Sequence, residues 1–264
     1  MQRAIIFLVV LTLGLIAFAQ FLRRTSMFFP ERYPLGSWDS QRGEDVWLTT
    51  SDKVRLHGWL YRASDPQAPL LIFFHGNAGN ITERAPIAIG MAQHGVSVLL
   101  FDWRGYGRSE GEPSESDLFK DAEAAYQFAR TKNVVLYGES LGGPYAASVA
   151  KKHGARALIL DSTFPSLAAL GNTLYWPLPL GATAPFALRT LTWANESHVP
   201  TLVLHSRHDD VMPFRLGKAL FDGLSVPKEM LTSEVRGHCA ISFDDPRYFE
   251  TVARFVKSTP PPRS

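Results

Sequence analysis

The stretch "VVLYGESLGGPYAASVA", residues 134–150, decides how this chain folds. It opens with a short apolar run and closes with an alanine-rich run. Between the two runs, glycines at 138, 142 and 143 surround a single serine, Ser140. The pattern predicts a buried strand, a tight turn and a helix, with the serine in the turn.

The same alternation of apolar runs and helical patterns continues on both sides of this stretch. Four further apolar runs predict strands buried on both faces: residues 69–76, 96–105, 155–162 and 199–206. Upstream, "EDVWLTT" (44–50) and "VRLHGWLYRA" (54–63) predict an antiparallel pair with a turn at Ser51-Asp52. Strands that alternate with helices imply an α/β fold, a mostly parallel central sheet with helices on both faces.

Composition excludes several classes of protein and site. Of 264 residues, 45% are hydrophobic and 20% are charged, which suits a globular domain with a sizeable core. The net charge of +2 is too small to indicate a nucleic-acid partner. No metal-ligand spacing such as CxxC or HExxH occurs, so we expect no metal site. The single cysteine, Cys239, cannot form an intramolecular disulfide.

The N-terminus predicts a membrane segment. The run "AIIFLVVLTLGLIAFAQFL", Ala4–Leu22, carries no charge. As a helix it would be about 28 Å long, close to the roughly 30 Å of a bilayer core. We therefore expect residues 1–24 to be a single-pass membrane anchor and residues 25–264 to form the globular domain. The alternative is a cleaved signal peptide, because Ala17-Phe18-Ala19 fits the small-x-small cleavage pattern. Cleavage would leave a secreted or periplasmic protein.

One segment breaks the alternation of strands and helices. Residues 165–198 carry only two formal charges, Arg189 and Glu196, and prolines at 177, 179 and 185 argue against one regular helix. We interpret the segment as a small cap inserted over the carboxyl end of the sheet. The alternative is an ordinary crossover helix with a loop. Apolar side chains above a site would suit an acyl chain or a membrane surface.

The turn around Ser140 has the form of a nucleophile elbow. In a G-x-S-x-G turn between a strand and a helix, the serine is held in a strained conformation at the helix N-terminus. The glycines are required because side chains there would clash with the strand and the helix. The backbone N–H of Leu141 would point toward a developing oxyanion. The alternative is a plain glycine-rich turn.

A serine nucleophile needs a base, and the base needs an orienting acid. On sheets that carry such an elbow, the acid and then the histidine follow the serine in the chain. Among the eight histidines, only His238, in "RGHCAIS", lies beyond the last predicted sheet strands in a polar loop. His238 is therefore the predicted base.

The acid should follow a strand between the serine and the histidine. Asp209 and Asp210, in "LVLHSRHDDVMPF", come just after a buried strand, and Asp161 ends an earlier one. A second oxyanion donor is expected from the loop after the first parallel strand, "HGNAGN". There, Asn77 is the predicted backbone donor, with Ala78 next.

These runs resemble the α/β-hydrolase family, and more narrowly its membrane-anchored abhydrolase-domain branch of lysophospholipases and depalmitoylases. The resemblance is carried by six runs between residues 73 and 239: "FFHGNAGN", "FDWRGYGRSEGEPSE", "VVLYGESLGG", "LILDSTFPSL", "HSRHDDVMPF" and "RGHC". In that branch the acid stands in a pattern like H-G-x-x-D-x-x-V-P, which implies Asp209 rather than Asp210. The chain departs from the branch at Cys239, where asparagine is common. The resemblance also implies that the "DWRGYGRSEG" loop is structural, with a phosphate-binding role for Arg104 or Arg108 as the alternative.

Together these features predict a serine hydrolase that cleaves carboxylic esters or thioesters, with acyl-lipid or other acylated molecules as substrates. Ser140, His238 and Asp209 would form the triad, and backbone N–H groups of Asn77 and Leu141 the oxyanion hole. This chemistry requires no cofactor. Two alternatives remain open: a serine peptidase or amidase, which would use the same triad, and a membrane-tethered interaction module without catalysis.

Overall fold

The structure is a computed structural model that describes residues 14, 27–32, 41–129, 133–174 and 188–261. Apart from Gly14, the run predicted as a membrane anchor lies outside these ranges, as does the middle of the predicted cap, residues 175–187. None of the helices within these ranges has the length and apolarity needed to span a membrane.

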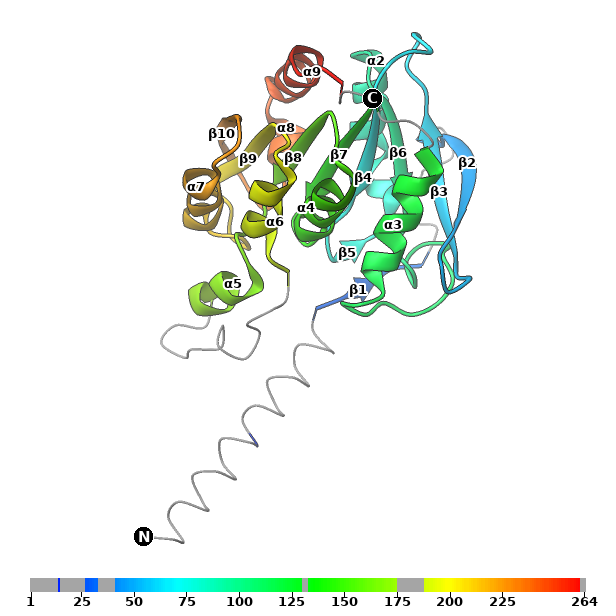
Figure 1. The fold of residues 1–264 in the computed structure, drawn as a ribbon, viewed down its shortest axis with the longest axis horizontal. Coiled ribbons are helices and arrows are strands. Elements are labelled where there is room, and N and C mark those ends of the chain that lie inside the picture. The colour runs from blue at the N-terminus through cyan, green and yellow to red at the C-terminus, as the bar shows by residue number, and fades with distance from the viewer. Residues whose placement is uncertain (1–13, 15–26, 33–40, 130–132, 175–187, 262–264) are drawn as a thin grey trace, which may run out of the picture.

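The centre of the fold is a sheet with the strand order β10-β9-β8-β7-β4-β6-β3-β2 (Figure 1). β3 runs antiparallel to both of its neighbours, and the remaining adjacent strands pair in parallel. This confirms the mostly parallel sheet and its mixed edge. The strand bounds are β2 Glu44–Thr49, β3 Arg55–Tyr61, β4 Leu70–Phe74, β6 Ser97–Phe101, β7 Val134–Glu139, β8 Ala157–Asp161, β9 Thr201–His208 and β10 Lys228–Arg236.

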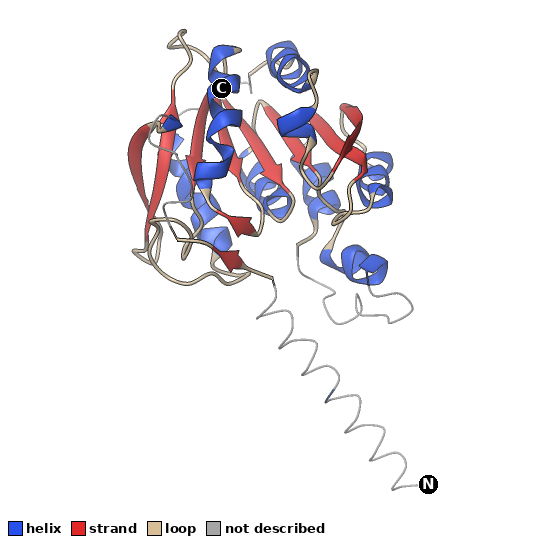
Figure 2. Ribbon diagram, turned by 180° about the vertical axis from the view of Figure 1, so that it is seen from behind, coloured by secondary structure: helices blue, strands red, loops and turns tan. Residues whose placement is uncertain are grey.

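Helices cover both faces of this sheet (Figures 1 and 2). Buried residues of α3, α4, α6 and α7 join one apolar cluster, and those of α2, α8 and α9 join the other. Successive residues of the central strands alternate between the clusters: Ile72 belongs to the first, and Leu71 and Phe73 to the second. The helix bounds are α2 Ala85–Gln93, α3 Leu118–Ala129, α4 Gly142–His153, α5 Leu167–Leu174, α6 Thr190–Ser197, α7 Phe214–Gly223, α8 Ile241–Asp244 and α9 Tyr248–Ser258, with the 3-10 helix η2 at Ile81–Arg84.

The two described helices of the segment 165–198, α5 and α6, differ in how far they are buried. α6 lies against α4 in the helical layer, where Ala194 is buried and the Trp193 ring meets Phe119 at 5.7 Å. α5 has no buried residue, and Leu174 at its end is 46% exposed. α6 is therefore a crossover helix of the sheet, and the cap remains a prediction for the residues between the two helices.

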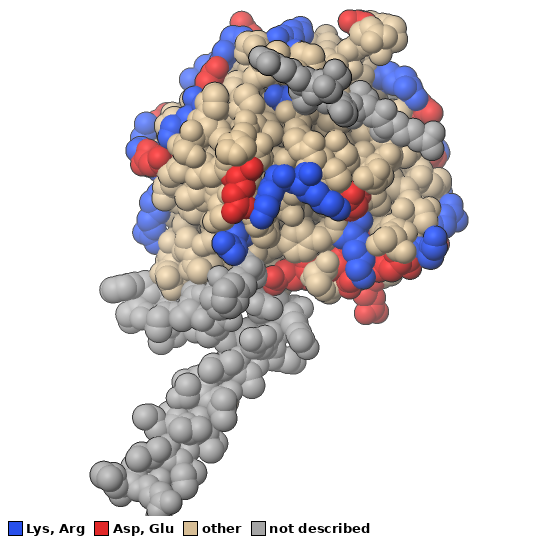
Figure 3. Space-filling view, in the orientation of Figure 1, with Lys and Arg blue, Asp and Glu red and all other residues tan. Residues whose placement is uncertain are grey.

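Basic and acidic side chains are interspersed over most of the face seen in Figure 3, and several acidic side chains lie along its lower edge. Exposed ion pairs join Arg62 to Glu44 and Lys218 to Asp222. Such pairs contribute little to stability, so the two apolar clusters are what hold the fold together.

The arrangement of the sheet brings four chain segments to one edge. Parallel strands end at the same side, so the residues that follow β4, β7, β9 and β10 meet there. Those segments begin at residues 75, 140, 209 and 237, and they contain every residue predicted from the sequence to act in the site.

Candidate active site

The turn at Ser140 has the geometry that its glycines predict. Ser140 has a φ of 50°, in the left-handed region that a side-chain-bearing residue adopts at a cost of about 1–3 kcal/mol. A Cβ on Gly142 would lie 1.9 Å from the carbonyl oxygen of Phe74, and one on Gly138 would lie 2.5 Å from Cα of Gly143. Glycine is therefore required where the strand, the helix and the end of β4 meet.

Three side chains form one hydrogen-bonded series at this turn. Nε2 of His238 lies 2.9 Å from Oγ of Ser140, and Nδ1 of His238 lies 2.8 Å from Oδ2 of Asp209. These residues follow β7, β10 and β9, and the serine and the histidine are 98 positions apart in the chain. The structure thus brings the predicted nucleophile, base and acid together.

Of the three carboxylates considered from the sequence, Asp209 alone contacts the histidine. It is buried, and its Oδ1 accepts the backbone N–H groups of Val211 and Met212 at 3.0 and 2.7 Å. Asp210 is exposed. Asp161 instead accepts the hydroxyl of Tyr137 at 2.6 Å, and burial raises its pKa to about 7. The backbone N–H bonds fix the Asp209 carboxylate in the orientation that faces the ring.

The environment of His238 favours its protonated form. Burial by itself would lower the pKa of the imidazole, but the hydrogen bonds and the charge of Asp209 outweigh it. The charges of Glu139 and Asp161 act in the same direction, so the pKa of His238 is raised above 6.5. An imidazole in this setting is well suited to accept a proton from a hydroxyl and hold it.

A glycine loop, defined as residues 75–80, lies directly against the serine turn. The N–H of Gly76 donates to Oε1 of Glu139 at 3.0 Å, and a Cβ on Gly76 would lie 3.5 Å from Cβ of Ser140. The carbonyl of Asn77 accepts the hydroxyl of Tyr106 at 2.8 Å, which fixes the orientation of that peptide. Leu141 is buried at the N-cap of α4. The segments that carry the two predicted donors therefore lie next to the serine, and the donor roles of Asn77 and Leu141 stay predictions.

An N-terminal strap, defined as residues 27–32, holds the glycine loop from outside, and the sequence did not predict it. Its strand β1, Phe29–Pro30, pairs in parallel with β5, Ala78–Gly79. The N–H of Phe29 donates to the Asn77 carbonyl at 2.8 Å.

A second feature missed from the sequence is a buried ion pair. Arg84, at the end of η2, donates from Nη2 to Oε1 of Glu139 at 2.8 Å. Glu139 directly precedes the serine and is 1% exposed. Neither residue stands in a charge pattern that distinguishes it from a surface residue, so no sequence signal indicated the contact.

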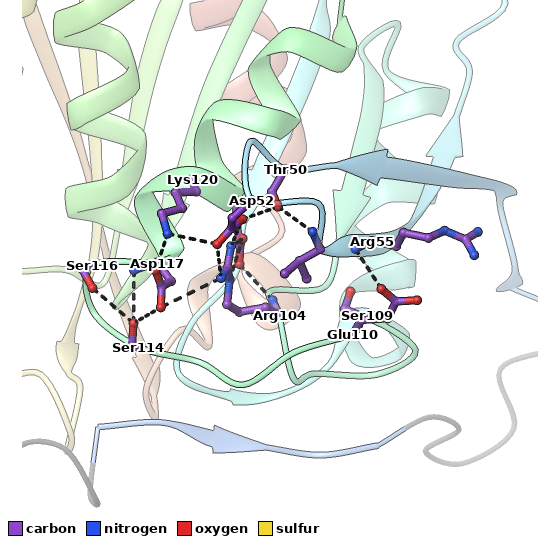
Figure 4. A network of polar contacts seen from close by, with 12 residues as sticks. Thr50, Asp52, Arg55, Arg104, Ser109, Glu110, Ser114, Ser116, Asp117 and Lys120 are labelled. Carbon is purple, nitrogen blue, oxygen red and sulfur yellow. Dashed lines mark hydrogen bonds and ion pairs between the residues drawn. The ribbon is translucent and has the colours of Figure 1, made fainter.

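The rim loop, residues 102–111 with the sequence "DWRGYGRSEG", is structural, as the resemblance implied. Arg104 is buried, and its guanidinium donates to Asp52 (Figure 4). It also donates to Oδ1 of Asp121 at 2.7 Å. Lys120 joins the same network through Asp52 and Asp117. The alternative of a phosphate site is wrong for Arg104, because its donors are already occupied by carboxylates. For Arg108 it stays a prediction.

Cys239 is a buried free thiol whose pKa is raised by burial, and it follows His238 with a φ of 57°. In the part of the chain that the structure describes, no group of three or more metal-ligating side chains is found.

The sequence is similar to one protein family and to several known proteins. A sequence family described as serine aminopeptidase S33 matches residues 65–185. An uncharacterized protein of Mycobacterium tuberculosis is 33% identical over 256 residues, which are 93% of this chain and 91% of the relative. Protein bem46 of Schizosaccharomyces pombe is 31% identical over 214 residues, 71% of this chain and 70% of its own. The alpha/beta hydrolase domain-containing protein WAV2 of Arabidopsis thaliana is 33% identical over 193 residues, 64% of this chain and 63% of its own.

The chain belongs to the α/β-hydrolase family. A solved esterase of Pyrococcus furiosus, Pf2001, has the same fold, with a TM-score of 0.71 at 20% identity, over 89% of this chain and 98% of the esterase. In an α/β-hydrolase the elbow, the acid loop and the histidine loop all lie at the carboxyl edge of the sheet, which is where this chain has them.

Proposed function

We propose that this α/β-hydrolase is a serine hydrolase that cleaves carboxylic ester or thioester bonds through an acyl-enzyme. The observation that carries the proposal is the continuous series of hydrogen bonds from Ser140 through His238 to Asp209. The fold shared with the P. furiosus esterase supports it. No cofactor takes part in the proposed chemistry.

The proposed reaction has two halves. In the first, Ser140 Oγ attacks the carbonyl while His238 Nε2 takes its proton, and the protonated ring then delivers that proton to the leaving alcohol or thiol. In the second, water attacks the acyl-serine with the same histidine as base. Asp209 keeps the proton of the neutral ring on Nδ1 and stabilises the imidazolium.

The oxyanion of each tetrahedral intermediate would be held by backbone N–H groups. We assign this role to Asn77 and Leu141, which lie on the two segments that flank the serine. Removing one such donor typically lowers kcat by about 10²–10³-fold, so these groups would supply a large part of the rate enhancement.

Acyl-lipid or other acylated molecules are the substrates we propose. The uncharged, apolar composition of residues 165–187 and the exposed Leu174 support this class. We further propose that the uncharged run Ala4–Leu22 anchors the protein in a membrane as a single pass. Release of the full chain by alkaline carbonate from a membrane preparation would contradict the anchor, as would a mature chain that lacks these residues.

A second candidate is amide or peptide cleavage, because the matched family is described as a serine aminopeptidase. The deciding assay compares short and long p-nitrophenyl esters with aminoacyl p-nitroanilides, using the full chain and its Ser140→Ala variant. We expect Ser140-dependent ester hydrolysis whose kcat/KM rises with acyl length. Preference for short charged aminoacyl amides would favour the peptidase, and absence of any Ser140-dependent turnover would leave the interaction module.

A further inference from the structure

We propose that Glu139 and Arg84 are positioning residues that hold the glycine loop in register with Ser140. This inference rests on the proposed function, because it assigns a purpose to the placement of the loop that would supply an oxyanion donor. Neither residue touches the reacting atoms in the proposed mechanism, and both act through the backbone of residues 76–80.

The contacts fasten the loop at both ends. Oε1 of Glu139 accepts the N–H of Gly76, the second residue of the loop, at 3.0 Å. Nη1 of Arg84 donates to the carbonyl of Asn80, its last residue, at 3.3 Å. The two side chains are joined to each other at 2.8 Å. One ion pair therefore ties the beginning and the end of the loop to the residue that precedes the nucleophile.

The burial of this pair needs an explanation other than stability. The Glu139 side chain is 1% exposed and that of Arg84 is 13% exposed. Burying two charges costs several kcal/mol per ion, and well-packed apolar residues of the same volume are often as stable or more so. The charge of Arg84 also keeps the pKa of Glu139 below its usual value despite burial. The carboxylate thus stays an acceptor for Gly76.

Steric fit leaves the loop little freedom at this point. A Cβ on Gly76 would lie 3.0 Å from Oε1 of Glu139, so the backbone of Gly76 packs closely against the carboxylate. If that acceptor is removed, a buried N–H is left without a partner, at a cost of about 1–3 kcal/mol. The loop would relieve this by moving away from Ser140, and a displacement of about 1 Å can lower kcat by about 10²-fold.

Two double variants separate the hydrogen bond from the charges. Both Glu139→Gln/Arg84→Met and Glu139→Leu/Arg84→Met remove the ion pair, but only the first keeps an oxygen that can accept the Gly76 N–H. We expect the leucine variant to lose about 10²-fold in kcat with KM within about twofold of the wild type. The glutamine variant keeps the bond to Gly76 but loses the Arg84 bonds, so its kcat should fall by at least about tenfold and by less than that of the leucine variant.

A matched control removes another buried pair. Arg104→Met/Asp121→Leu disrupts the pair that holds the rim loop, where the side chains are 5% and 0% exposed. This control should lower Tm without lowering kcat at temperatures well below Tm. If Glu139→Leu/Arg84→Met does not fold, Arg84→Lys gives the answer, because it keeps the charge and loses the forked guanidinium. Its kcat should fall about tenfold at unchanged KM.

The results that would overturn the inference are distinct from failure of the proposed function. If wild-type turnover depends on Ser140, the proposed function stands, and the inference alone is then at issue. Equal kcat losses in both double variants would overturn it, and so would no loss in the leucine variant. An unchanged kcat in Arg84→Lys would also overturn it, as would a control that loses as much kcat as the leucine variant. Absence of Ser140-dependent turnover in the wild type overturns the proposed function and the inference together.

Discussion

Replacing Asp209 with asparagine tests how the acid orients the base. In the structure, Oδ1 of Asp209 accepts two backbone N–H groups, from Val211 and Met212, while Oδ2 faces Nδ1 of His238. An asparagine amide has one oxygen and one NH₂ group to place. If the oxygen stays with the two backbone donors, the NH₂ group faces the imidazole. The ring nitrogen there must then be an acceptor, so the proton lies on Nε2, where it blocks uptake of the Ser140 proton.

The size of the effect follows from these contacts. The opposite placement of the amide would leave the buried N–H of Met212 without an acceptor, at about 1–3 kcal/mol. Loss of the carboxylate also removes a charge-assisted hydrogen bond to the imidazolium, worth about 1.5–3 kcal/mol. Together these terms amount to about 2.5–6 kcal/mol, and each 1.36 kcal/mol changes the rate about tenfold. We therefore expect Asp209→Asn to lower kcat by about 10²–10⁴-fold.

The assay is steady-state hydrolysis of a p-nitrophenyl ester by the full chain. KM should change little, because Asp209 does not contact the substrate in the proposed mechanism. Asp210→Asn is the matched control: its carboxylate is adjacent in sequence but exposed, and kcat should stay within about twofold. An Asp209→Asn variant that keeps more than about a tenth of the wild-type kcat would refute this reasoning.

Three further predictions concern the turn, the base and the rim loop. Gly142→Ala should lower the free energy of unfolding by about 1–3 kcal/mol and kcat by about 10²-fold, because the added Cβ would lie 1.9 Å from a backbone oxygen. Denaturant unfolding and ester hydrolysis measure the two effects, and an unchanged kcat would contradict the tight packing of the elbow. Because only neutral His238 can accept a proton and its pKa is raised, kcat/KM should fall as pH drops through an apparent pKa above 6.5, and a midpoint below that value contradicts the assigned environment. Arg104→Leu should lower the free energy of unfolding by about 3–5 kcal/mol, because it leaves the buried carboxylate of Asp121 without its partner. Lys218→Ala removes the exposed ion pair with Asp222 and should lower it by less than about 1 kcal/mol, so equal losses would count against the network.

The central sheet could be predicted because most of its parallel strands are marked in the sequence by short apolar runs. The apolar runs that became β4, β6, β7, β8 and β9 each read as strands buried on both faces, and the two apolar clusters explain why. Ser140 was predictable because a G-x-S-x-G turn between a strand and a helix has a steric cause. His238 followed from chain order alone, once the turn was recognised.

The contacts that surround the site were not predictable in the same way. The strap pairs with a two-residue strand, β5, and 49 positions separate Phe29 from Ala78. Glu139 and Arg84 are 55 positions apart, and each is a single charge in its own segment. Neither periodicity nor turn chemistry encodes such long-range pairings. Asp209 was predictable only in part. The end of its strand could be read from the sequence, but the choice of Asp209 over Asp210 came from a resemblance to a known family. The structure explains that choice through two backbone N–H groups that hold the Asp209 carboxylate.

The most direct test of the account is whether Ser140 becomes covalently modified. The full chain is treated with a fluorophosphonate, and the adduct is located by intact mass and peptide mapping. The account predicts a single adduct, on the peptide that contains Ser140, which is absent from Ser140→Ala and forms far more slowly in His238→Ala. Absence of an adduct on the folded wild type, or an adduct that persists in Ser140→Ala, would contradict the claim that this serine is the nucleophile.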